Sequence, residues 1–259
     1  MLSRAHLHAL SQLHRRRERD EQGVLLLEGV RSVEAALDAG ADVLEVLVTD
    51  EAARTDRVAA LLARTHAPLH AVGARDLDRI ATTENAQGLV AVARQPAPAD
   101  LGAARRLLAL DGVQDPGNVG TLVRTAAWFG LDAVLAGPGS ADLFSPKVVR
   151  SAMGGLWDVP LARTDALGAG DLAAALHAWR GADGRIAGAL MDGQDAAAWQ
   201  PSGRVALVLG SEGHGLSAAV EALLDDPLTL PGSPRRRGAE SLNVGVAGGV
   251  LMWRLASGS

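Results

Sequence analysis

The sequence contains no cysteine. Disulfide bonds, thiolate-bound zinc, iron–sulfur clusters and a catalytic thiol are therefore excluded. It also has no apolar run of the roughly 18–20 residues that a membrane span needs, and the polar segment after Met1 lacks the apolar stretch of a signal peptide. We therefore expect a cytoplasmic protein with no membrane partner.

Lysine is almost absent as well, because Lys147 is the only one and the other cations are arginines. The formal net charge of -5 argues against a protein that coats nucleic acid non-specifically, since phosphate binding needs clustered cations. The net charge does not exclude local patches of cations. Two arginine clusters stand out, Arg15, Arg16, Arg17 and Arg19 near the start and Arg235, Arg236 and Arg237 near the end. Taken alone, such a run usually marks a solvated face.

The length and composition favour two folded domains. The chain has 259 residues, 48% hydrophobic and 21% charged, which is a globular composition, and domains usually have about 100–200 residues. Residues 94–106 contain prolines and alanines without strand-like alternation, a pattern typical of a linker. We expect a first domain over residues 1–95, a linker over 96–106 and a second domain over 107–259.

Hydrophobic periodicity predicts an α/β fold for both parts. In the first part we expect a small α/β domain with strands at 24–28, 43–49, 69–72 and 88–93 and helices at 3–16, 30–39, 53–65 and 74–81. In the second part we expect buried strands at 107–111, 132–136, 186–190, 205–209 and 228–230, with helices at 119–129, 146–153, 171–179 and 216–224. Repeated βα units of this kind predict a mostly parallel sheet covered by helices.

The first candidate functional segment is DPGNVGTLVRTA, residues 115–126, directly after a predicted strand. Pro116 and Gly117 form a turn, Asn118 is placed to cap the following helix, and Gly130 ends it. At about 100° per residue, Arg124 points away from the apolar face of this helix. It therefore faces solvent, a ligand or a subunit, and a helix cap with a solvated arginine is the plain alternative.

The second segment is VALVLGSEGHGLS, residues 205–217, in which a buried strand opens into a glycine-rich loop. In open α/β sheets a ligand usually binds near a strand's carboxyl end. The glycine order is not GxGxxG and no Lys-Ser or Lys-Thr follows, which disfavours NAD and ATP sites. Glu212 is a ligand contact or an acid in a first helical turn, and His214 is predicted to be an exposed loop residue rather than a base.

The third segment runs from LTLP at 228–231, through the second arginine cluster, to ESLNVGVAGGVLMW at 240–253. Ser241 is a candidate cap for a helix over 241–256 that contains Gly245, Gly248 and Gly249. Each glycine costs a helix about 1 kcal/mol relative to alanine, so we expect them to permit close packing against another backbone. A helix contact within a dimer is one such use.

In this order, DPGNVGTLVRTA, LVLGSEGHGLS and LP…ESLNVGVA resemble the three motifs of the SpoU/TrmH-type RNA ribose methyltransferases of the SPOUT class. LLLEGVRSVEAAL and TTENAQGLVAV also resemble segments of the substrate-binding domain of these enzymes, a fold shared with ribosomal RNA-binding proteins. The resemblance implies a C-terminal, trefoil-knotted methyltransferase domain behind a small RNA-binding domain. Because true knots are rare, periodicity alone would not have suggested one.

The resemblance also implies the reaction and its residues. S-adenosyl-L-methionine would methylate a ribose 2′-hydroxyl of RNA, with ribosomal RNA favoured over tRNA, in a homodimer without a metal ion. The active centre would contain Asn118, Arg124, Glu212, Ser241 and Asn243. The cofactor would meet Leu209, Gly210, Leu230 and Leu242. Apart from the resemblance, the two arginine clusters predict that RNA meets Arg15, Arg16, Arg17, Arg235, Arg236 and Arg237.

Two questions stay open at this level. A guanidinium group is protonated at physiological pH, so we expect Arg124 to bind a phosphate and not to act as the base that the family proposal makes it. Ser241 or water would then relay the proton. The loop from Pro231 to Ser241 is longer than in the family and lacks the usual Pro-Met, which affects the cofactor side of the site. The competing function is a non-catalytic RNA-binding or ribosome-assembly factor with the same fold.

Overall fold

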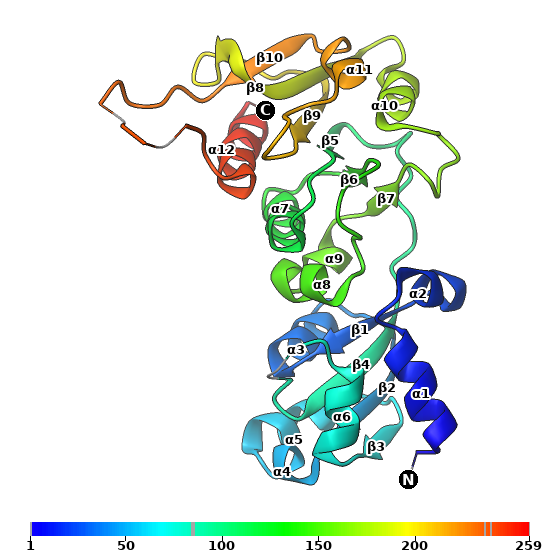
Figure 1. Cartoon of the computed structure of the whole chain (residues 1–259). Coiled ribbons are helices and arrows are strands. Elements are labelled where there is room, and N and C mark those ends of the chain that lie inside the picture. Colours follow the sequence, from blue (N-terminus) through cyan, green and yellow to red (C-terminus); the bar gives the residue numbers. More distant parts are fainter. Residues whose placement is uncertain (1, 84–85, 236, 239, 259) are drawn as a thin grey trace. The chain divides into compact units, whose positions relative to one another are not determined.

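The computed structural model describes residues 2–83, 86–235, 237–238 and 240–258, and the chain divides into two compact units (Figure 1). Unit 1 comprises the chain up to Pro96 together with Asp142–Asp158. Unit 2 comprises Ala97–Ala141 and the chain from Val159 onward. Each unit contains its own sheet, and the α/β class expected from the sequence is confirmed.

Unit 1 is built on a four-stranded sheet in the order β1-β4-β2-β3. Strand β4 is antiparallel to both β1 and β2, and β2 is parallel to β3. The strands are β1 (Val24–Glu28), β2 (Val43–Val48), β3 (Leu69–Ala71) and β4 (Leu89–Arg94). The four strands expected for the first domain are therefore confirmed to within about a residue at each end, a normal uncertainty for boundaries.

The helices of the first part are more broken than the periodicity predicted. They are α1 (Arg4–Gln12), α2 (Arg16–Gln22), α3 (Val30–Asp38), α4 (Asp50–Ala53), α5 (Asp56–Leu62) and α6 (Ala74–Ile80). The single helix expected over 3–16 is wrong, because Arg15 has an extended backbone and a second helix begins after it. The helix expected over 53–65 corresponds to α5, which begins only after Thr55, where the backbone is extended, and ends at Leu62.

The segment between β6 and β7 of unit 2 packs within unit 1. It contains α8 (Pro146–Ala152) and α9 (Gly155–Asp158). Two ion pairs hold it there, one between Arg19 and Asp142 and one between Arg150 and Glu28. The Glu28 side chain is 0% exposed and also accepts hydrogen bonds from Thr82 N and Oγ1, each 2.8 Å long. The residue spacing in the sequence carries no sign of this placement.

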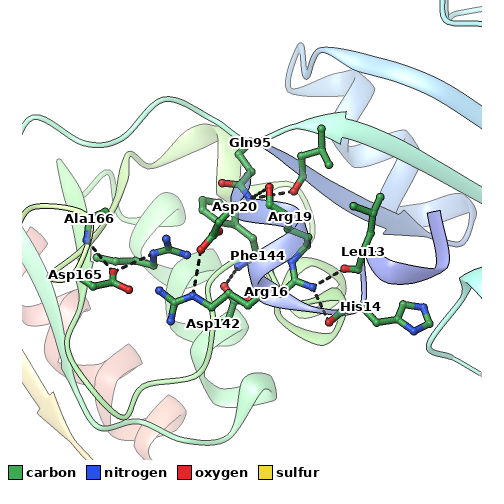
Figure 2. Close-up of polar contacts among 12 residues, drawn as sticks. Leu13, His14, Arg16, Arg19, Asp20, Gln95, Asp142, Phe144, Asp165 and Ala166 are labelled. Atoms are coloured by element: carbon green, nitrogen blue, oxygen red, sulfur yellow. Dashed lines mark hydrogen bonds and ion pairs between the residues drawn. The ribbon is translucent and has the colours of Figure 1, made fainter. Parts of the chain in front are cut away.

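Arg19 differs from the other arginines of its cluster. Its side chain is 2% exposed and donates hydrogen bonds to the carbonyls of Leu13 (2.6 Å) and His14 (2.8 Å) as well as to Asp142 (Figure 2). Asp142 Oδ1 in turn accepts from Phe144 N at 3.0 Å. Burial of a charge is tolerated only when the charge is paired and hydrogen-bonded, so Arg19 is part of the core and not of a solvated face.

Unit 2 contains a six-stranded sheet in which every pairing is parallel, in the order β10-β8-β9-β5-β6-β7. The strands are β5 (Arg106–Asp111), β6 (Ala133–Ala136), β7 (Leu161–Arg163), β8 (Gly184–Asp195), β9 (Arg204–Gly210) and β10 (Asp226–Thr229). The mostly parallel sheet is thus confirmed. The edge strand β7 was not predicted.

Helices cover both faces of this sheet (Figure 1). They are α7 (Pro116–Trp128), α10 (Leu172–Arg180), α11 (Ala218–Glu221) and α12 (Val244–Ser257). Leu176 and Trp179 of α10 pack into one buried cluster with strand residues, while α12 packs against α7 and β9. The helix expected over 216–224 is only four residues long, since Leu223 and Leu224 bond to carbonyls three residues back and form turns. The trefoil knot stays a prediction.

Candidate active site

Helix α7 begins at the carboxyl end of β5 and positions Asn118. The cap is Asp115, whose Oδ1 accepts a 2.9 Å hydrogen bond from Asn118 N, and Pro116 follows it in the first helical turn. The prediction that Asn118 caps the helix is therefore wrong. The local reason is that an aspartate followed by proline is a strong start signal, and it occupies the cap position three residues earlier. The Asn118 amide is consequently free for other partners.

The loop after β9 folds back tightly on itself. Ser211 and Gly215 exchange two backbone hydrogen bonds of 2.9 Å each, and Ser217 N donates to Asp111 Oδ2 at 2.6 Å. A β-carbon at Gly210 would lie 2.2 Å from the carbonyl carbon of Gly215, so only glycine fits there. Glu212 is exposed on this loop.

Helix α12 begins at Asn243. Its Oδ1 accepts hydrogen bonds from Gly245 N (2.9 Å) and Val246 N (3.3 Å). The prediction that Ser241 caps this helix is wrong, because the helix starts two residues later and asparagine is an equally good cap. Ser241 is exposed in the preceding segment.

Three side chains from the three motifs meet at one carboxylate oxygen. Glu212 Oε1 accepts from Asn118 Nδ2 at 2.7 Å and from Asn243 Nδ2 at 2.8 Å. Asn243 Nδ2 also donates to Asn118 Oδ1 at 3.1 Å. Residues as far as 125 positions apart thus form one polar cluster at the carboxyl ends of the strands, where a ligand of such a sheet is expected.

Arg124 and Ser241 do not join this cluster. Arg124 is exposed on α7, about one and a half turns beyond Asn118. Within residues 2–83, 86–235, 237–238 and 240–258, no hydrogen bond or ion pair joins either side chain to Glu212 or to the two asparagines. Arg124 is therefore available to a ligand that approaches from solvent.

The four residues predicted to meet a cofactor lie around the carboxyl ends of β9 and β10. Leu209 is fully buried, and its side chain lies under α12, since a β-carbon at Gly248 would be 2.6 Å from Leu209 Cδ1. Only its backbone can therefore meet a ligand. Gly210 ends β9, Leu230 directly follows β10, and Leu242 is 53% exposed just before α12. Backbone groups beside an exposed leucine fit an uncharged, partly apolar group such as a nucleoside.

The strand pairing changes at the same place. The β8–β9 ladder ends at the Gly188–Val208 pair, whereas β8 stays paired with β10 as far as Asp195 and Thr229. The last two residues of β9 are thus paired only with β5 in these ladders. Backbone groups that are not paired with β8 in these ladders, beside a glycine-rich turn, suit the recognition of an adenine ring and a ribose.

The glycines of α12 pack closely within the chain, but against side chains and not against another backbone as predicted. A β-carbon at Gly248 would lie 2.4 Å from Leu122 Cδ2 of α7. The large apolar side chains of α12 divide into two groups. Leu251 is buried, whereas Val246, Val250 and Trp253 are 55%, 43% and 55% exposed. We call these last three residues the α12 stripe.

The predicted RNA-binding arginines lie at the surface where the structure describes them. Arg235 and Arg237 are exposed, and Arg236 lies outside the described residues. Arg15 is exposed too, while the exposed Arg16 and Arg17 pair with Asp20 and Glu21 one helical turn on. Among the described residues, no group of three acidic or histidine side chains is placed to hold a metal ion, and no helix has the length and hydropathy to cross a membrane.

Two family models match the chain. The model of the SpoU rRNA Methylase family matches residues 105–253, and that of the MRM3-like substrate binding domain matches residues 5–91. The second match includes Glu84 and Asn85 of the TTENAQGLVAV segment, which lie outside the described residues.

Individual relatives agree with these matches. The chain is 35% identical to the 23S rRNA (guanosine(2553)-2′-O)-methyltransferase RlmP of Bacillus subtilis, over 94% of this chain and 92% of that protein. A TrmH-family structure from Porphyromonas gingivalis is 35% identical with a TM-score of 0.83 and covers 100% of both chains. The SpoU methyltransferase AviRb of Streptomyces viridochromogenes, solved with AdoMet, has the same fold at 24% identity, with a TM-score of 0.83 and 98% of each chain covered.

Proposed function

Because the chain belongs to the SpoU rRNA methylase family, we propose that it transfers a methyl group from S-adenosylmethionine to a ribose 2′-hydroxyl of ribosomal RNA. The chain is an RNA methyltransferase, and the 2′-hydroxyl is the position named for its B. subtilis relative. The observation that carries the proposal is the meeting of Asn118, Glu212 and Asn243 from three separate motifs at one carboxylate oxygen.

Different residues of the chain are assigned to the two substrates, S-adenosylmethionine and RNA. When bound, S-adenosylmethionine supplies an electrophilic methyl group. We assign its binding to the backbone at Leu209, Gly210, Leu230 and Leu242. Arg124 binds the RNA phosphate beside the target nucleotide and stabilises the negative charge that develops on the 2′-oxygen. To Ser241, two residues before Asn243 in the chain, we assign the orientation of the ribose.

We assign RNA recognition to the first domain, residues 1–95, joined through the linker 96–106 to the methyltransferase domain 107–259. The substrate-binding match over 5–91 supports this division. The exposed Arg15, Arg16 and Arg17 would meet phosphates there. The enzyme would act in the cytoplasm as a homodimer.

The direct test is to map 2′-O-methylated positions in total RNA from cells with and without this protein. We expect one or a few positions in ribosomal RNA to lose methylation when the protein is absent. Calorimetry with S-adenosylmethionine separates the competing function, because a non-catalytic assembly factor would bind RNA without binding the cofactor. Loss of no methylated position, together with no heat of cofactor binding, would decide for that alternative.

The homodimer is tested by its mass. The α12 stripe leaves three large apolar side chains in water on one helix, more than a terminal helix of a monomer usually exposes. We expect light scattering at micromolar concentration to give twice the mass of 26.7 kDa. A monomer mass would contradict the assignment, and Trp253→Glu should produce monomers if the stripe is the contact.

The second arginine cluster should bind RNA phosphates. Each phosphate contact adds close to one unit to the slope of log K against log salt, so replacing Arg235, Arg236 and Arg237 by glutamine should weaken RNA binding and flatten that slope by about two to three units. Cofactor affinity should barely move, because these cations are assigned to RNA. If the three arginines are only solvated and do not contact RNA, the slope should be unchanged in the triple variant.

A further inference from the structure

The hydrogen bonds of the polar cluster distinguish its three members. Asn243 uses its Oδ1 to cap α12 and its Nδ2 to bond both Glu212 and Asn118. An amide nitrogen has two hydrogens, so the donors of Asn243 are fully used. The hydrogen bonds of Asn243 therefore connect α12 to α7 and to the loop after β9, which is a structural role.

Glu212, in contrast, has an oxygen that the cluster does not use. A carboxylate has two oxygens, and both amide donors go to Oε1. Among the residues that the structure describes, none donates to Oε2. Glu212 is exposed, so this oxygen is open to a molecule that binds at the cluster. The two amides hold Oε1 from different helices and thereby set the direction of Oε2.

The neighbouring groups are less suited to take the proton at this place. Arg124 has a guanidinium, which has no acceptor atom and keeps its protons at physiological pH. Ser241 can only relay a proton to a further acceptor. His214 is exposed on the same loop, but its side chain takes no part in the cluster bonds.

We propose that Glu212 Oε2 is the general base of the methyl transfer, an inference that rests on the proposed function. The ribose 2′-hydroxyl gives its proton to Oε2 while O2′ forms a bond to the methyl carbon. The bond between that carbon and the sulfonium sulfur breaks, and sulfur keeps the electron pair. The carboxylate ends protonated and releases its proton to water. Arg124 acts in the same step as the cation that stabilises the charge on O2′.

The decisive variant is Glu212→Gln. Glutamine keeps an Oε1 that accepts from both asparagines, but replaces Oε2 by an NH₂ group that cannot accept a proton. Removal of a general base lowers rates by about 10²- to 10⁴-fold, so single-turnover methyl transfer should fall by about 100-fold or more. The affinities for S-adenosylhomocysteine, by calorimetry, and for the RNA substrate, by filter binding, should stay within about threefold, a change of under 1 kcal/mol.

A role as a mere clamp for the two asparagines predicts a different result, namely that Glu212→Gln transfers methyl groups at nearly the wild-type rate. A large loss of either affinity would also overturn the proposal, since it would make Glu212 a binding group. The matched control is Glu221→Gln, an exposed glutamate of α11 in the same unit, which should leave the rate and both affinities unchanged.

A second variant keeps the test decisive if the glutamine variant does not fold. Glu212→Ala should lose the same activity, and added formate should restore part of it by supplying a carboxylate in the vacated space. Absence of rescue in a folded, cofactor-binding Glu212→Ala protein would contradict the proposal. If the wild-type protein itself transfers no methyl group to RNA, the proposed function fails, which is distinguishable from failure of the role of Glu212.

Discussion

Replacing Arg124 by alanine should reduce methyl transfer by about 1,000-fold, because removal of one preorganised group that stabilises developing negative charge costs about 10²- to 10³-fold and the phosphate contact is lost as well. Arg124 is exposed, and no described residue pairs with its side chain. The substitution therefore leaves the fold intact. Cofactor affinity should stay within about threefold, since Arg124 is assigned to the RNA side of the reaction.

The measurement combines single-turnover methyl transfer with calorimetry of cofactor binding and a thermal unfolding curve. Arg105→Ala is the matched control, because Arg105 is an exposed arginine of the same unit just before the opposite end of the neighbouring strand β5. The control should keep its cofactor affinity and its stability. The assigned role would be wrong if Arg124→Ala lost cofactor affinity or unfolded.

Replacing Arg150 by alanine should destabilise unit 1 by about 3–5 kcal/mol, the usual cost of removing one partner of a buried ion pair. The Glu28 carboxylate is fully buried and pairs with the Arg150 guanidinium. Thr82 would still donate to Glu28, but neutral donors do not balance a charge that has no water around it. Part of the loss should appear as detachment of the 142–158 segment.

Urea unfolding monitored by hydrogen exchange should show this effect in α8 and β1. Arg31→Ala, at an exposed arginine of α3, should change the free energy of unfolding by less than about 0.5 kcal/mol. Glu28→Gln in the Arg150→Ala background should recover most of the lost stability, since a neutral amide is cheaper to bury than a carboxylate. A stable Arg150→Ala protein would mean that the ion pair contributes little.

The sequence alone determined the α/β class, the parallel sheet of unit 2, most strand positions, the family, and the three segments that carry the site. These follow from local patterns, because short apolar runs beside glycine predict buried strands and ordered motifs are specific. Helix boundaries were less predictable. Asp115 and Asn243 took the cap positions expected for Asn118 and Ser241, since several good capping residues stood close together and only backbone geometry chooses between them.

Only the tertiary structure decided which polar groups meet. Nothing in the spacing indicated that Asn118 and Asn243 would share Oε1 of Glu212 and leave Oε2 open, because that depends on how α7, α12 and the loop after β9 are placed by packing. Nor did the spacing mark Arg19 and Glu28 as buried, or place residues 142–158 in unit 1. The physical reason is the same in each case. A charge is stable in a core only beside a partner, and these partners lie more than 100 positions away along the chain.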